Sequence, residues 1–249
     1  MAGPVIDVHT TGPADSTWAG WRERCPPLPI RHWRRLIVVA AHPDDEILGA
    51  GGLLALAAAA AMTVTIVVAT DGEASHPGSV THDPARLARL RAAESRRAAT
   101  ELGLAAPLRL GLPDGRLAEF EHRLTADVRG LLGEQRTPGL RCVAPWRHDG
   151  HPDHEAAGRA AAAACASIGA RLLEYPVWMW QWADPDHPRV RRTDPAALSL
   201  TATARAAKHR ALHCFPTQTE PLSTDPADAP ILPGHILRRF TGPTEIYFR

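Results

Sequence analysis

Short apolar runs alternate with longer helix-like runs along most of this chain, and this alternation restricts the possible folds more than any other feature. The apolar runs are rich in β-branched residues and have the length of strands, whereas the runs between them have the length and pattern of helices. The expected strands are 35–41, 62–69, 107–112, 140–145 and 171–178. The expected helices are 47–61, 84–103, 118–133, 154–168 and 198–213. The alternation predicts an α/β fold with a mostly parallel central sheet and helices on both faces.

The length of the chain is compatible with a single domain and one sizeable core. Its 249 residues contain no internal repeat and no linker that would divide domains. Residues 1–33 carry Gly, Pro and Trp without a clear period, so we expect an N-terminal arm that packs on one domain spanning residues 34–249. Residues 214–235 hold several prolines and no period, which predicts an ordered loop over one edge of the domain.

Composition and charge argue against several classes of protein. A net charge of +1 gives no global field that would favour nucleic acid or an anionic membrane, and the arginine runs at 31–35 and 189–192 are expected to be solvated surface. The alanine-rich run at 55–62 is too short to span a membrane, and the N-terminus has no apolar signal-peptide core. The 4 cysteines show no CxxC spacing. We therefore expect a cytoplasmic protein with a small-molecule substrate, and nothing in the sequence indicates its oligomeric state.

The first expected strand ends in a crowded polar motif, His42-Pro43-Asp44-Asp45-Glu46. In an open α/β sheet, ligands bind beyond the C-terminal ends of the strands. Ionisable groups crowded at such a place are costly unless they are neutralised, and a divalent metal neutralises them directly. A second cluster of histidines and carboxylates, over residues 148–155, follows the expected strand at 140–145. Two such clusters at strand ends favour one shared metal site.

The residues expected to bind the metal are His42 and Asp45 from the first motif and His154 from the second. Two histidines and one carboxylate with an open position are the ligands with which catalytic zinc holds and acidifies a water molecule. The same ligand set serves iron in oxygenases, so Fe²⁺ or another divalent transition metal is an alternative to Zn²⁺.

Asp44 is the residue that favours chemistry over binding alone. It is adjacent to Asp45 and cannot easily share its geometry, so it is free to face the water and accept a proton as general base. The alternative is that Asp44 caps the following helix, which is a common role for aspartate at such a position.

His151 and Asp153 are also expected to act in catalysis. Held by a hydrogen bond to Asp153, His151 would stay protonated and would stabilise an oxyanion or protonate the leaving amine. The alternative is that His151 only orients the metal ligands. The sequence does not distinguish these two roles.

The motifs at 41–46 and 151–154 resemble those of the LmbE-like or PIG-L family of zinc-dependent N-deacetylases. The resemblance extends over residues 34–249, and it implies a Rossmann-like fold of three layers. It also implies removal of the acetyl group from an N-acetylated sugar, often N-acetylglucosamine, with release of acetate. The roles that it implies are zinc binding by His42, Asp45 and His154, general-base catalysis by Asp44, and assistance to the tetrahedral intermediate by His151.

The same resemblance assigns substrate binding to two further residues. Arg91 matches an arginine that holds the substrate in members of the mycothiol pathway, and Asp114 matches an acid that contacts sugar hydroxyls there. Each has a simpler interpretation: Arg91 as an exposed helix residue paired with Glu94, and Asp114-Gly115 as a turn.

The chain departs from the family pattern at two places. Asp149 stands where mycothiol-type deacetylases have a tyrosine. Many relatives have a histidine three residues before a late Ser/Thr-Gln pair, whereas here Phe215 precedes Thr217-Gln218, with His213 nearby. Both departures affect the substrate rather than the reaction. The alternatives within enzymes are an amidase of mycothiol-type conjugates and a deacetylase that tailors a natural product. A non-catalytic metal- or sugar-binding protein is disfavoured, because binding needs the ligands but not the free carboxylate of Asp44.

Three tryptophans, Trp178, Trp180 and Trp182, follow the fifth expected strand. Indole faces suit sugar rings or an aromatic aglycone, so this segment could form a wall of the substrate site. A strand that buries alternate aromatic residues would give the same pattern.

Overall fold

The computed structural model describes residues 6, 8, 10, 12–135 and 137–249. Within these residues seven strands form one mixed sheet in the order β3-β2-β1-β4-β5-β7-β6. Strands β1 to β5 pair in parallel, and β7 is antiparallel to its neighbours β5 and β6. The strands are β1 (Arg35–Ala40), β2 (Thr63–Thr70), β3 (Leu108–Leu112), β4 (Leu140–Pro145), β5 (Arg171–Tyr175), β6 (Pro195–Ser199) and β7 (Thr244–Phe248).

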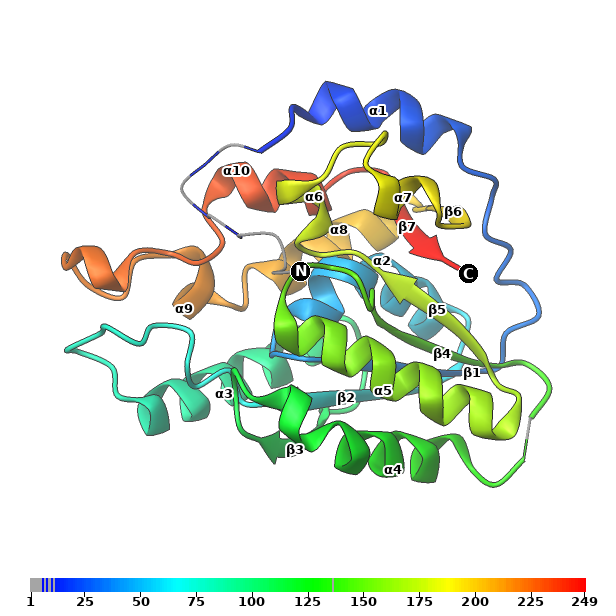
Figure 1. The fold of residues 1–249 in the computed structure, drawn as a ribbon, viewed down its shortest axis with the longest axis horizontal. Coiled ribbons are helices and arrows are strands. Elements are labelled where there is room, and N and C mark those ends of the chain that lie inside the picture. Colours follow the sequence, from blue (N-terminus) through cyan, green and yellow to red (C-terminus); the bar gives the residue numbers. More distant parts are fainter. Residues whose placement is uncertain (1–5, 7, 9, 11, 136) are drawn as a thin grey trace.

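Helices cover both faces of this sheet (Figure 1). One face carries α2 (Asp45–Ala59), α3 (Pro84–Glu101) and α8 (Ala202–Leu212), and the other carries α4 (Glu121–Leu132) and α5 (Pro152–Ile168). The shorter elements are α1 (Asp15–Arg24), η1 (Leu117–Phe120), α6 (Met179–Trp182), α7 (Pro188–Arg191), α9 (Pro216–Thr219), η2 (Pro226–Asp228), α10 (Gly234–Leu237) and η3 (Arg238–Phe240). The expected α/β fold with a mostly parallel sheet is confirmed.

The main differences from the expected elements lie near the C-terminal end of the chain. Strands β6 and β7 were not expected. Strand β6 reads Pro-Ala-Ala-Leu-Ser, which is poor in β-branched residues, and its extended form comes from pairing with β7. The helix expected over 198–213 begins at Ala202, because Thr201 caps it by accepting a hydrogen bond from the Ala204 amide. The segment 214–235, expected to be a loop, contains α9 and η2 and the start of α10.

Close packing fixes the position of helix α2, which begins with Asp45 of the first motif. A Cβ atom at Gly49 would overlap the ring of Tyr175, so glycine allows α2 to lie directly on β5. The hydroxyl of Tyr175 donates to the Val39 carbonyl at 2.8 Å, which ties β5 to β1. On the other side of α2, the buried Lys208 donates to the Leu48 carbonyl and to Glu245. The helix that delivers the first motif is therefore held from both sides.

Part of the N-terminal arm expected over residues 1–33 packs on the body. Trp18 of α1 is buried, and its ring lies 4.9 Å from that of Trp180 in an edge-to-face arrangement. Residues 1–5, 7, 9 and 11 of the arm lie outside the described residues. The described helices include none that is both long and apolar enough to cross a membrane.

Candidate metal centre and active site

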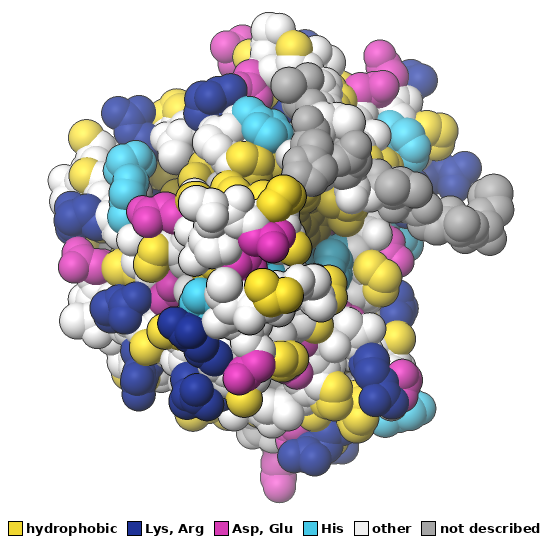
Figure 2. Space-filling view, turned by 90° about the vertical axis from the view of Figure 1, so that its left-hand side faces the viewer, with side chains coloured by type: hydrophobic (Ala, Val, Ile, Leu, Met, Phe, Trp, Pro, Cys, Tyr) yellow, Lys and Arg dark blue, Asp and Glu magenta, His cyan; other side chains and the backbone are white. Residues whose placement is uncertain are grey.

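The two polar motifs meet at one edge of the sheet, because β1 and β4 are parallel neighbours. After β1 the chain forms β2 and β3 on one side of β1, and it then returns to form β4 on the other side. In α/β sheets ligands bind in the crevice at such a reversal of strand order. A cavity of about 220 Å³ lies there. Figure 2 shows this face of the molecule, with histidine and acidic side chains in and beside its hollow. Both motifs contribute to the lining of the cavity: His42, Asp44 and Asp45 from the first, His151 and His154 from the second.

The three expected metal ligands lie close together. Nδ1 of His42 is 3.3 Å from Nε2 of His154 and 3.4 Å from Oδ2 of Asp45, and Nε2 of His154 is 3.2 Å from Oδ1 of Asp45. Tetrahedral zinc with bonds near 2.0–2.1 Å separates its ligand atoms by about 3.3 Å. The spacing of this His42–Asp45–His154 cluster therefore fits a zinc-sized ion.

The other contacts of His42 and His154 leave one ring nitrogen of each with a lone pair for a metal. His154 Nδ1 lies 2.8 Å from the carboxylate of Asp149, which can only accept, so that nitrogen carries the proton and Nε2 is free to ligate. His42 Nε2 lies 3.0 Å from Asp114 and 3.3 Å from Asp153, so its free nitrogen is Nδ1. The free nitrogens of the two rings are the pair that lies 3.3 Å apart.

The charge of the cluster also favours a cation. Burial alone would lower the pKa of His154, but the carboxylates of Asp45 and Asp149 outweigh it and raise this pKa to about 9. Burial opposes protonation of His42 as well, yet Asp114, Asp153 and Asp45 hold its pKa well above the usual value. The carboxylates thus attract positive charge into a buried site, and a divalent ion supplies that charge without protonating the ligands.

Asp44 occupies a backbone conformation that side chains rarely adopt, with φ at 129°. Such a conformation costs on the order of 1–3 kcal/mol and is found most often at functional sites. Asp44 stands at the N-terminal boundary of α2, but its carboxylate makes no capping hydrogen bond to the described helix. The capping role considered for this side chain is therefore not the one observed. Instead the carboxylate lines the cavity and accepts from Arg91 at 3.1 Å.

The pKa of Asp44 is raised to about 7, first by burial and then by the charges of Asp45 and Glu46, while Arg91 acts in the opposite direction. A carboxyl group with a pKa near neutrality can both accept and return a proton. Burial also raises the pKa of Glu46 to about 7. Glu46 faces away from this chemistry, since it accepts hydrogen bonds from the Asp44 amide and from Ser95.

His151 differs from its expected environment. Its Nδ1 accepts from the backbone amide of Asp153 at 3.3 Å, so the hydrogen bond between these residues is made by the backbone of Asp153. Burial, followed by the charges of His154 and His42, lowers the pKa of His151 to about 3. The ring is therefore neutral at neutral pH, with the proton on Nε2. His151, His42 and His154 form another group close enough to hold a metal, but a protonated Nε2 makes His151 a donor rather than a ligand.

Two carboxylates of the second motif hold the site in place. Asp153 accepts from the amides of Gly115 and Leu117 and from His42, so its lone pairs are occupied by structural bonds. Asp149, which is fully buried, accepts from the amides of Val177, Trp178 and Met179 as well as from His154. The role of Asp149 was missed from the sequence. Its position five residues before His154, an expected metal ligand, was the available signal.

Arg91 and Asp114 both line the cavity. Arg91 is buried rather than exposed, and it does not pair with Glu94: it donates to Gly72 and Pro43 carbonyls and to Asp44. Asp114 accepts from the Ala74 amide at 2.8 Å and stands at the turn that the sequence also indicated. The bond to His42 and the nearby charge hold the pKa of Asp114 well below its usual value, although burial opposes this. Their contacts with substrate stay a prediction.

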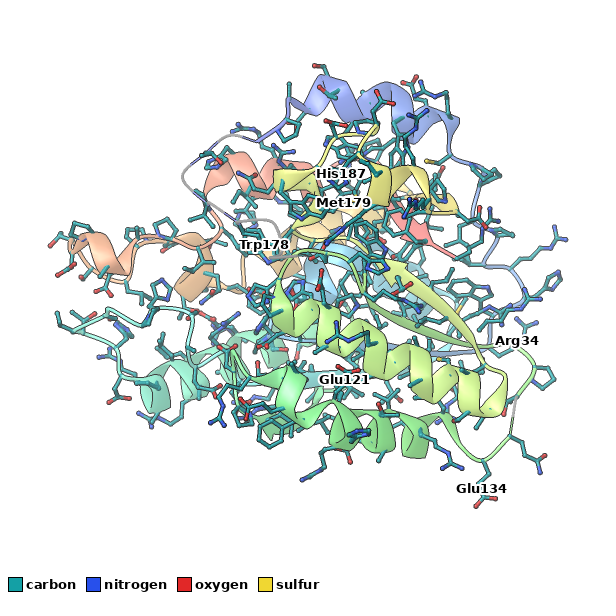
Figure 3. All side chains as sticks on the ribbon, in the orientation of Figure 1. Arg34, Glu121, Glu134, Trp178, Met179 and His187 are labelled. Carbon is teal, nitrogen blue, oxygen red and sulfur yellow. The ribbon has the colours of Figure 1, made fainter. Side chains whose placement is uncertain are left out.

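The three tryptophans have different surroundings. Trp178 lines the cavity, and Figure 3 shows it near the middle of the molecule, away from the exposed Arg34. Trp180 packs on Trp18 of the arm, and Trp182 stacks on Trp146 while its indole donates to the Asp149 carbonyl at 2.6 Å. Of the three, Trp178 is therefore the one placed to form a wall of the site.

Comparisons with known proteins agree with this geometry. A family model described as "PIG-L: GlcNAc-PI de-N-acetylase" matches residues 37–165, which include both motifs. The probable N-acetyl-alpha-D-glucosaminyl L-malate deacetylase 2 of Bacillus subtilis is 33% identical over 130 residues, covering 50% of this chain and 58% of that protein. The 1D-myo-inositol 2-acetamido-2-deoxy-alpha-D-glucopyranoside deacetylase of Nakamurella multipartita is 32% identical over 176 residues, covering 68% and 56%.

The chain thus spans little more than half the length of these two curated relatives. Among solved structures, a deacetylase triple mutant of the teicoplanin biosynthetic pathway has a TM-score of 0.65. The similarity covers 86% of this chain and 96% of the chain of that deacetylase, at 19% sequence identity. At this identity the similarity shows the fold alone.

Proposed function

The chain belongs to the PIG-L family of N-deacetylases, and from this premise we propose that it is a zinc-dependent hydrolase that removes the acetyl group from an N-acetylated amino sugar. The observation that carries the proposal is the position of Asp44. Its carboxylate lines the same cavity as the His42–Asp45–His154 cluster, in a strained backbone conformation and without a capping hydrogen bond to α2. A protein that only bound metal or sugar would not need this free carboxylate.

In the proposed reaction Asp44 accepts a proton from the attacking water, whose oxygen forms a bond to the acetyl carbonyl carbon. His151 donates its Nε2 proton in a hydrogen bond to the carbonyl oxygen as negative charge develops there. The bond between carbon and nitrogen then breaks, and Asp44 returns its proton to the amine nitrogen, so that acetate and a free amino sugar are released. The position of the Asp44 carboxylate on the cavity wall, beside the cluster, suits it to both transfers.

His42, Asp45 and His154 would hold the metal ion in this scheme. A zinc ion bound there polarises the amide carbonyl and acidifies water, which is the Lewis-acid chemistry that amide hydrolysis needs. Asp149 fixes the ring of His154, and Asp153 and Asp114 fix that of His42, so that the free nitrogens face one another. We propose zinc rather than iron because the ligand spacing suits a tetrahedral site.

The direct test is to measure acetate release from aryl glycosides of N-acetylglucosamine by the metal-loaded protein. We expect stoichiometric acetate and free amine, and loss of both in Asp44→Asn. The exposed His148 lies in the second cluster outside the site, so His148→Ala should retain activity and serves as the control. Absence of acetate release from every N-acetylated sugar, with one equivalent of metal bound, would contradict the proposed function.

A further inference from the structure

A serine of the cavity has an unusual hydrogen-bonding constraint. Ser75 lies in the loop after β2, at the same edge of the sheet as the metal cluster, and it lines the cavity beside Ala74 and Asp114. Its Oγ is 3.0 Å from Nδ1 of the neighbouring His76. No role was assigned to either residue from the sequence, and the proposed reaction does not use them.

The partners of His76 determine which group donates. Nε2 of His76 lies 3.1 Å from the carbonyl oxygen of Ala229, which can only accept, so Nε2 carries the proton. Burial lowers the pKa of His76, so the ring is neutral and its Nδ1 is an acceptor. Ser75 must then donate its single hydroxyl proton to Nδ1. Ser75 Oγ then has only lone pairs left, so it can only accept a hydrogen bond from a ligand in the cavity.

Two neighbouring polar groups of the cavity have the same character. Asp44 and Asp114 present carboxylate oxygens. The one Lys or Arg side chain among the described lining residues is Arg91; both of its terminal nitrogens already donate to carbonyls or to Asp44, and its buried Nε has no partner in the described part of the chain. A ligand group that satisfies Ser75, Asp44 and Asp114 must bring donors, as the hydroxyl groups of a sugar do.

We propose that Ser75 is a specificity-determining residue that accepts a hydrogen bond from one hydroxyl group of the substrate sugar, and that His76, held by the Ala229 carbonyl, imposes this direction. The inference rests on the proposed function, because it assumes a sugar in the cavity. It predicts that replacing this hydroxyl with fluorine, which has a similar size but no proton to donate, is penalised. A site that could rotate its serine hydroxyl would tolerate the replacement better.

The test uses an aryl N-acetylglucosaminide and analogues in which each ring hydroxyl is replaced singly by fluorine. We expect one analogue to lose about 10-fold in kcat/KM with the wild-type protein, the loss corresponding to one hydrogen bond. Ser75→Ala should lower kcat/KM for the parent compound by about the same factor and should no longer distinguish the parent from that analogue.

Ser79→Ala is the matched control, because it makes the same change in the same loop at a residue outside the cavity lining. It should leave the discrimination unchanged. His76→Phe removes the acceptor of the Ser75 proton, so Ser75 can donate and the penalty on the fluorinated analogue should shrink. If Ser75→Ala does not fold, His76→Phe still tests the proposal, because the same penalty in that variant as in the wild type would contradict it.

The inference is overturned if Ser75→Ala discriminates among the analogues as the wild-type protein does, or if no analogue is penalised. Failure of the proposed function looks different, since then the unmodified parent compound itself releases no acetate.

Discussion

The turns after β1 and β4 build the site. They have similar compositions, but their carboxylates make different contacts. The turn after β1 presents Asp44 and Asp45 toward the cavity. The turn after β4 also contains two aspartates, Asp149 and Asp153, but amides from remote segments bind both of them. Asp45, in contrast, accepts amide hydrogen bonds from Ala41 and His42 in its own turn. In the second turn the imidazoles face the cavity and the carboxylates hold the structure.

This difference distinguishes carboxylates that can take part in the reaction from carboxylates that hold other residues in place. Residue type alone does not distinguish them. Amide hydrogen bonds occupy both oxygens of Asp149 and of Asp153, so few lone pairs are left for a metal or a proton. Both amide bonds of Asp45 are made to Oδ2, which leaves Oδ1 available beside His154. Asp44 has one charged partner, Arg91, and a strained backbone, so it remains available for proton transfer. We therefore regard Asp153, which was grouped with the catalytic residues from the sequence, as a positioning residue for His42.

The largest expected effect comes from removing a metal ligand. His154→Ala should abolish tight binding of the divalent ion and reduce turnover to background. Only His42 and Asp45 would remain as ligands, and a catalytic zinc site needs three from the protein. Metal analysis of protein purified without added metal should find close to one equivalent in the wild type and almost none in the variant. Full activity in metal-free protein would show that the two turns do not form a metal site.

Asp44→Asn should leave metal content and melting temperature unchanged while turnover falls by roughly two to four orders of magnitude, the usual range for loss of a general base. Asparagine can still accept a hydrogen bond from Arg91, so the change tests proton transfer rather than folding. If turnover in the variant stays near the wild-type value, Asp44 belongs with the supporting carboxylates of the second turn.

His151→Ala should lower turnover by about 10²–10³, as expected for losing one donor to a developing oxyanion. The sign of its pH dependence follows from the lowered pKa of about 3. The ring is already neutral above that pH, so its deprotonation cannot cause a loss of rate on the basic side. The basic limb of the kcat/KM profile should therefore persist in the variant at fixed metal content. Disappearance of that limb would restore a cationic role for His151.

The sequence was sufficient for the parts of the site that depend on chain order. β-branched runs and polar motifs at their ends predicted β1, β4 and the convergence of His42, Asp45 and His154, because parallel strands end at one edge. Contacts between remote segments were not predictable. The amides that bind Asp149 come from the turn after β5, and Ala229, which orients His76, comes from a segment expected to be a loop. β6 was missed for the same reason, since pairing with β7 determines it.

The smallest expected effect tests the supporting role of the second turn. Asp149→Asn replaces one acceptor oxygen with an amide that has only protons to offer, so either His154 or the backbone amides of 177–179 lose a partner. We expect metal affinity to fall by about 10- to 100-fold, as for other residues that orient metal ligands, while turnover at saturating metal changes much less.

The matched control is Asp228→Asn. Asp228 is also buried and accepts from Thr81 and Ser223, joining two loops without contacting a metal ligand. It should lower the melting temperature without changing metal affinity. Titration with a competing chelator measures the affinity of both variants. An equal loss of affinity in the two would mean that general destabilisation, rather than orientation of His154, links the second turn to the metal, whereas a loss confined to Asp149→Asn assigns that turn its supporting function.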